Sequence, residues 1–384
     1  MKVNPLLAAI VVAAQSLSNI RAEDPAGVAD LVEKLKSGVT EAARSKAAQT
    51  LGEKGESAAT AVPALLQALA NDPDGTVRHN AAWALGKIKT PVVEIVPALI
   101  AALEDRDWTV RHNSVLSLSW IGKDAEAQLQ SAISAENPMK RVYALSALAA
   151  INPDGAALHA SVLIELARNT SPGVRGLAAG IVATLGSRLP EAVPALVALL
   201  KDEDALVRGR AVEALGKIGK SAQSAVPAVI EILKTDKERP NRTAAAVTLG
   251  EIGSEDPVAI TALVAALGDK ESRIRAYCSA SLGRIGSPAV SQLDECLRSE
   301  DPRVRMHAAM ALGGMAGAAK PAVGSLVTRL QDTDINVRIN SAAALGAIGD
   351  GSAEVKSALE KARDREAQDP VFKAYMEQAL SMLK

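Results

Sequence analysis

An arginine recurs along the whole chain at almost constant spacing, with gaps of 30 to 35 residues between successive copies. Its positions are Arg44, Arg78, Arg111, Arg141, Arg175, Arg208, Arg242, Arg275, Arg305 and Arg338, and Lys373 holds the last equivalent place. A period in the range of roughly 20–50 residues indicates stacked repeats, in which each unit buries its apolar face against its neighbours. This feature outweighs the division into separate globular domains that a length of 384 residues would otherwise suggest.

Each repeat predicts two helices. The first carries V-P-A-L-x-x-x-L and the second D-x-x-V-R-x-x-A-A-x-A-L-G-x-I-G, with a short acidic loop between them. Proline is tolerated at a first helical position because its missing N–H would be unpaired there. The first helices are therefore predicted to open at Pro63, Pro97, Pro194, Pro227, Pro288 and Pro321. Four residues before the arginine stands a residue type that caps helix N-termini. These predicted N-caps are Thr40, Asp74, Asp107, Asn137, Ser171, Asp204, Asp301, Asp334 and Asp369.

The second helix has one apolar face. At about 100° per residue, the positions one before and three, seven and ten after the arginine share a side. Val77, Ala81, Leu85 and Ile88 show this pattern, so these positions are predicted to form the core. The positions one, two, five and nine after the arginine lie opposite and vary between repeats, so they are predicted to face solvent.

The arginines themselves allow two interpretations, a clamp for an anionic ligand or a structural ladder between units. Each lies within about 40° of the core direction, and an acidic N-cap precedes most of them. The sequence therefore favours a ladder of charge-assisted hydrogen bonds from each guanidinium to a neighbouring cap or loop carbonyl. This ladder comprises Arg78, Arg111, Arg141, Arg175, Arg208, Arg242, Arg275, Arg305 and Arg338.

Aromatic residues are scarce and unevenly placed. The chain has three tryptophans, three tyrosines and one phenylalanine, and four of these lie between residues 83 and 143: Trp83, Trp108, Trp120 and Tyr143. The triplet Arg-His-Asn also occurs in two adjacent units of this region. The predicted partner-binding patch consists of His79, Asn80, Trp83, His112, Asn113, Trp120 and Tyr143. Exposed tryptophan and tyrosine are typical of binding hot spots. The alternative is that these side chains merely pack between units.

The repeat string resembles the HEAT-repeat family, in particular the short units known from phycobilisome lyases. The resemblance covers about residues 27–384, or eleven units. It implies an all-α fold, a right-handed α-solenoid of stacked two-helix HEAT-like repeats whose second helices line a concave groove. It says little about function, because one fold serves many activities.

Catalytic and nucleic-acid-binding functions find little support. HEAT-type di-iron hydroxylases carry His-Glu pairs, whereas the four histidines here read His79-Asn80, His112-Asn113, His159-Ala160 and His307-Ala308. The 43 basic and 44 acidic residues balance, so no basic face for phosphates is indicated. The sequence predicts a non-enzymatic scaffold or adaptor that binds a protein or peptide in its groove, without cofactor or metal; a glycan is a weaker alternative partner. A lyase-type or other enzyme accessory subunit stays open as the alternative function.

Residues 1–22 have the character of a secretory signal peptide. Lys2 precedes an apolar run over residues 5–14, and Ala22 stands before Glu23. The run is too short to span a bilayer. The sequence thus predicts export to the periplasm or outside, cleavage after Ala22, and a single solenoid over residues 23–384. The alternative is an apolar helix that covers the first repeat of a cytoplasmic protein.

The two cysteines form no metal-binding motif. Cys278 occupies a core position and is predicted to be a small buried side chain. A disulfide with Cys296 would need an oxidising compartment and stays open.

Overall fold

The protein is described by a computed structural model over residues 25–365 and 368–383, and every regular element in these ranges is a helix. The predicted all-α fold of stacked helix pairs is confirmed. The predicted signal peptide lies outside the described residues, so export stays a prediction. None of the helices in the described ranges has the length and apolar character needed to span a bilayer.

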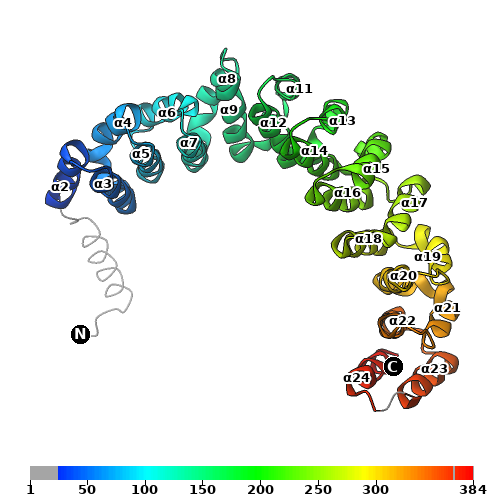
Figure 1. The fold of residues 1–384 in the computed structure, drawn as a ribbon. Coiled ribbons are helices and arrows are strands. Elements are labelled where there is room, and N and C mark those ends of the chain that lie inside the picture. The colour runs from blue at the N-terminus through cyan, green and yellow to red at the C-terminus, as the bar shows by residue number, and fades with distance from the viewer. Residues whose placement is uncertain (1–24, 366–367, 384) are drawn as a thin grey trace, which may run out of the picture. The chain divides into compact units, whose positions relative to one another are not determined.

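The chain falls into two compact units, of which the first ends at Val162 and the second begins at Leu163. In the first unit the helix pairs are α2 (Pro25–Ser37) with α3 (Glu41–Lys54), α4 (Val62–Asn71) with α5 (Gly75–Ile88), α6 (Val92–Ala101) with α7 (Trp108–Ile121), and α8 (Glu126–Ile133) with α9 (Pro138–Ile151). The first and second helices of these pairs form two separate rows, each packed on its neighbours in the row (Figure 1). The short helix α10 (Pro153–Ala157) follows, and α11 (Ala160–Leu166) contains the division between the units.

The second unit continues with α12 (Pro172–Leu185), α13 (Val193–Leu199) with α14 (Ala205–Ile218), α15 (Val226–Thr235) with α16 (Arg239–Ile252), α17 (Pro257–Ala265) with α18 (Ser272–Ile285), α19 (Val290–Cys296) with α20 (Pro302–Gly314), α21 (Val323–Arg329) with α22 (Ile335–Ile348), and α23 (Ala353–Arg365) with α24 (Pro370–Met382). Each second helix from α12 to α24 packs on the next one in its row (Figure 1). Since α10 and α11 stand where the fifth pair would have its first helix, all eleven predicted pairs can be recognised in the described ranges. Stacking is shown within each unit, and the single solenoid predicted over residues 23–384 stays a prediction.

Short 3-10 helices join many of these elements. They are η1 (Gly55–Ala61), η2 (Ala102–Glu104), η3 (Gly122–Ala125), η4 (Gly186–Arg188), η5 (Pro190–Ala192), η6 (Gly219–Ala225), η7 (Ala266–Gly268), η8 (Ser287–Ala289) and η9 (Ala316–Ala322).

The core is built from small aliphatic side chains, as the helical wheel predicts. Val77, Ala81, Leu85 and Ile88 of α5 are completely buried. Gly86 permits the close approach of α5 and α7, since a Cβ there would collide with the side chain of Ser117. The Ser117 hydroxyl uses this proximity to donate a hydrogen bond of 2.8 Å to the carbonyl of Ala82. Small residues therefore set the spacing between second helices.

The helix starts agree with the predicted caps, but three of the six prolines predicted to open a first helix do not open one. Asp74, for example, accepts hydrogen bonds from the N–H groups of Thr76 and Val77. Pro288 and Pro321 lie in η8 and η9, before α19 and α21 begin, so these two predictions are wrong. The prediction that Pro97 opens a helix is wrong, because α6 already begins at Val92 and Pro97 lies inside it. The extra turn forms because Pro91 provides the N-cap position and its carbonyl accepts the first backbone hydrogen bonds of α6.

Candidate functional site

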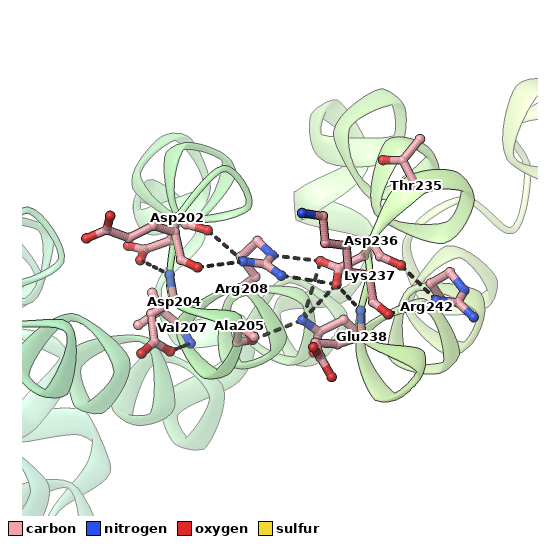
Figure 2. Close-up of polar contacts among 12 residues, drawn as sticks. Asp202, Asp204, Ala205, Val207, Arg208, Thr235, Asp236, Lys237, Glu238 and Arg242 are labelled. Atoms are coloured by element: carbon pink, nitrogen blue, oxygen red, sulfur yellow. Dashed lines mark hydrogen bonds and ion pairs between the residues drawn. The ribbon is translucent and has the colours of Figure 1, made fainter.

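The arginine column forms ion pairs between neighbouring repeats within each unit. Arg208 on α14 donates from Nε and Nη2 to the two carboxylate oxygens of Asp236, at 2.7 and 3.2 Å (Figure 2). Its Nη1 donates to the carbonyl of Asp202 in its own repeat, at 2.8 Å. The described residues include further copies of this two-pronged contact, and we call the following pairs the paired rungs: Arg44–Asp72, Arg78–Asp105, Arg175–Asp202, Arg208–Asp236 and Arg305–Asp332.

The aspartate of each paired rung connects three groups. Asp202 accepts from Arg175 through its carboxylate and from Arg208 through its carbonyl, and its Oδ1 also accepts from the N–H of Asp204. The hydrogen bonds from Arg175 hold the pKa of the Asp202 carboxyl below its usual value. The sequence pointed to loop carbonyls, which do accept from the arginines. It missed the aspartate two residues before the cap, although the recurring Asp-x-Asp and Asp-x-Glu triplets could have revealed it.

The ladder is interrupted where this aspartate is missing or does not reach the arginine. Ala135 stands in the aspartate position that follows Arg111, and Ser299 stands in the one that follows Arg275. Arg111 still donates from Nη1 to the carbonyl of Asp105 at 2.6 Å, but its guanidinium lies over the ring of Tyr143, 5.4 Å from the centroid. An aromatic ring thus replaces the carboxylate at this contact.

Trp83 and Trp120 come together around a lysine, and we call Trp83, Lys87 and Trp120 the tryptophan cluster. The Lys87 ammonium lies 5.7 Å from the ring centroid of Trp83 and 4.3 Å from that of Trp120. Both tryptophans are partly exposed. The Trp83 ring lies directly against Gly52 of α3, where an added Cβ would collide with it. Lys87 was not among the predicted site residues, although it lies one helical turn after Trp83 on the same side of α5.

The other residues of the predicted patch have different environments. Asn113 is buried, and its amide nitrogen lies 3.1 Å from the ring nitrogens of His79. Asn80 donates to the Ser45 hydroxyl at 2.8 Å, and His112 is exposed. Tyr143 is 8% exposed.

The predicted exposure of Asn113 and Tyr143 is therefore wrong. Both stand two residues after the repeat arginine, on the flank of the helix that packs on the preceding second helix, and this contact covers their side chains. The structure brings Trp83 and Trp120 together but turns these two residues inward.

Neither cysteine is in a disulfide. Cys278 is buried as predicted, and burial raises the pKa of its thiol to about 12. Cys296 is half-buried. In the ranges that the structure describes, no three His, Cys, Asp or Glu residues gather in a way that could hold a metal ion.

Helix pairs repeated in two rows define the class of α-solenoid repeat proteins. A family model described as HEAT repeats matches the chain over residues 28–95, 62–130, 125–205, 160–249, 198–277, 260–323 and 293–381. The chain belongs to the HEAT-repeat family, as its repeat string predicted. The finer likeness to phycobilisome-lyase units stays a prediction.

Solved structures with a similar fold include karyopherins. Kap121p bound to Ste12p has a TM-score of 0.64 and 14% sequence identity, with 97% of this chain and 46% of that chain covered. Yeast importin-beta (Kap95p) has a TM-score of 0.57 and 14% identity, with 95% and 58% covered. The chain thus spans about half the length of these karyopherins, and the likeness shows the fold alone. No curated protein matches the chain.

Proposed function

We propose that the protein is a non-enzymatic scaffold or adaptor that binds a partner protein through its row of second helices. The principal contact is the tryptophan cluster. The observation that carries this proposal is that Trp83 and Trp120, from adjacent repeats, leave part of each ring exposed on either side of Lys87. Large aromatic side chains supply much of the binding energy in protein interfaces.

The cluster is held in place before any partner arrives. The Trp83 ring rests on Gly52, and the Lys87 ammonium lies close to both indole rings. Ordering a flexible side chain on binding costs about 0.5–1.5 kcal/mol, so a preformed pair of rings favours association. The contact between Asn113 and His79 joins the same two helices, α7 and α5, that carry Trp120 and Trp83.

The chemistry of the cluster suits an extended peptide segment with an apolar and an acidic side chain. The exposed ring surfaces can cover the apolar side chain. The Lys87 ammonium donates no hydrogen bond to another described residue, so it can pair with a carboxylate. His112 is exposed at the start of α7, where its ring lies 6.5 Å from that of Trp108 and outside the cluster.

The experiment measures partner binding by the double variant Trp83→Ala/Trp120→Ala. Proteins captured by the full chain are identified by mass spectrometry, and the affinity of the purified partner is then measured by calorimetry. The double variant should lose at least tenfold in affinity while its far-UV circular dichroism is unchanged. Trp108→Ala is the matched control, because Trp108 is 64% exposed and lies outside the cluster. Equal affinity of both variants would refute the proposal.

Export of the protein is part of this proposal, and it rests on residues 1–22 alone. A mature chain that begins at Glu23 would support a partner outside the cytoplasm. An unprocessed N-terminus on the native protein would contradict export and favour the alternative of a cytoplasmic accessory subunit.

A further inference from the structure

A basic cavity lies in the second unit between α16 and α18. Its volume is about 860 Å³, within the range of roughly 300–1,000 Å³ that is common for ligand sites. Two glutamates and five basic residues line it: Glu238, Glu271, Lys237, Arg239, Arg242, Lys270 and Arg273. The wall is therefore positive overall, although the chain as a whole is almost neutral.

Arg242, like Arg275, is a member of the arginine column whose carboxylate-binding edge has no aspartate in the described residues, and its side chain lines this cavity. In Arg208, one repeat earlier, Nε and Nη2 hold Asp236. The corresponding acceptor for Arg242 would be Asp269, yet in the described part of the chain Arg242 bonds only through Nη1, to the carbonyls of Asp236 and Lys237 (Figure 2). The Nε–Nη2 edge, which matches a carboxylate in two parallel hydrogen bonds, has no protein acceptor at this cavity.

Small side chains on α16 create the space. At the positions one and five residues after the arginine, α5 carries His79 and Trp83, whereas α16 carries Thr243 and Val247. Thr243 and Val247 both line the cavity. This face is thus occupied by two large side chains on α5 and is hollow on α16.

Tyr277 of α18 lines the cavity and keeps 38% of its surface exposed. It is the repeat equivalent of Tyr143, whose ring is buried beneath Arg111 in the first unit. No such ring contact joins Tyr277 to Arg242 in the described residues. The guanidinium and the ring instead leave room between them for a ligand.

The two glutamates of the wall leave further donors available. Glu238 and Glu271 occupy the N-cap positions of α16 and α18, but neither carboxylate accepts a hydrogen bond from its own first turn. Aspartates at the equivalent positions of α5 and α14 do accept such bonds. The first turns of α16 and α18 therefore keep N–H groups that no side chain of their own cap residue satisfies.

We propose that this basic cavity binds an acidic peptide segment. One carboxylate of the segment occupies the Nε–Nη2 edge of Arg242, and a neighbouring side chain packs on Tyr277. The basic residues form a compact group interrupted by two carboxylates, which suits separate acidic side chains better than the continuous charge of a nucleic-acid backbone. This site lies in the other unit from the tryptophan cluster and does not depend on it.

The test uses a fluorescein-labelled peptide of alternating glutamate and glycine, whose binding to the full chain is followed by fluorescence anisotropy. Arg242→Gln should weaken binding about tenfold, since it removes a charge-assisted bidentate contact. Lys201→Gln removes the same charge from an exposed position outside the cavity and should change the affinity less than about twofold, as expected of a screened surface charge. The corresponding peptide of glutamine and glycine should not bind.

A second variant blocks the cavity without changing any charge. Val247→Trp places there the side chain that α5 carries at the equivalent position, Trp83, so the repeat can accommodate it. It should abolish peptide binding while helicity is retained. Wild-type affinity of Val247→Trp, or equal weakening by Arg242→Gln and Lys201→Gln, would overturn the proposal. The variant Trp83→Ala/Trp120→Ala should bind the acidic peptide like the wild type, which separates this site from the tryptophan cluster.

Discussion

Removal of the Asp332 carboxylate should strongly destabilise the contact between α20 and α22. Arg305 donates to Asp332 at 2.7 and 2.6 Å, and the two side chains are only 10% and 3% exposed. Asp332 also accepts from the N–H of Asp334 at 3.0 Å. Asp332→Ala therefore leaves a guanidinium without its counter-charge in a place that water hardly reaches.

The expected loss is about 3 kcal/mol. Breaking a buried pair by removing one partner costs roughly 3–5 kcal/mol. The lower end applies because Arg305 keeps its Nη1 hydrogen bonds to the carbonyls of Ser299 and Glu300, at 2.8 and 2.9 Å. As a control, Glu255→Ala breaks the ion pair with Lys220, whose side chains are 76% and 72% exposed. Such a solvent-screened surface pair contributes little to stability.

Amide hydrogen exchange in α20 and α22 measures this effect locally, which matters because the stability of a repeat array is a sum of unit and interface contributions. A loss of about 3 kcal/mol corresponds to roughly a hundredfold faster exchange through local opening. The double variant Arg305→Met/Asp332→Leu should recover part of the loss, since the buried guanidinium of Arg305 is removed as well. Arg329, whose side chain is 26% exposed, still loses its contact of 3.3 Å with Asp332 in both variants. If Asp332→Ala accelerated exchange no more than Glu255→Ala, the paired rungs would not stabilise the stack.

Two further predictions concern pH and thiol reactivity. Burial acts to raise the pKa of the aspartates in the paired rungs, but hydrogen bonds from the arginines and from backbone N–H groups together lower it below the usual value of 3.8. The stabilisation that these ionised aspartates provide is present above that pH and is lost as the pH falls through their lowered pKa values. The thermal midpoint of unfolding should therefore drop steeply below about pH 4, and Asp332→Ala should show a smaller drop than the wild type. A midpoint that stays constant down to pH 2 would contradict this prediction. A maleimide should label Cys296 in the native protein and Cys278 only in urea, because Cys278 is buried and the pKa of its thiol is raised to about 12. Mass spectrometry measures the labelling rate of each cysteine, and equal rates in the native protein would contradict the buried position of Cys278.

The periodicity made the interior of the repeat predictable. A position that holds Val77 or Leu85 in one unit holds similar residues in the others, so the core face and the N-caps follow from one alignment of the chain with itself. Contacts between repeats were less predictable. A helical wheel predicts the side of the helix on which Arg208 lies, but it does not predict which residue of the next repeat the side chain contacts. Only the packing of the helices shows that Arg208 binds Asp236. The predicted helix start at Pro97 was wrong because the residues before this proline also form part of the helix.

The candidate site shows the same division. The partial exposure of Trp83 and Trp120 follows from their wheel positions, because both point away from the apolar face. The burial of Tyr143 does not, since it depends on how closely α7 approaches α9. Lys87 joins the two indoles only once α5 and α7 lie side by side, so a single-helix argument could not include it.

The basic cavity lies where the ladder lacks an ion pair. Arg111, opposite Ala135, contacts Tyr143, and Arg242 leaves its open edge in the cavity beside Tyr277. In a repeat array, stability is nearly additive over neighbouring interfaces, so one missing rung costs little while the others hold the stack. A missing rung also leaves an arginine beside an aromatic side chain instead of an aspartate, and both residue types are enriched in binding hot spots. Interrupted rungs are therefore the places where this fold can acquire a binding site with the least loss of stability.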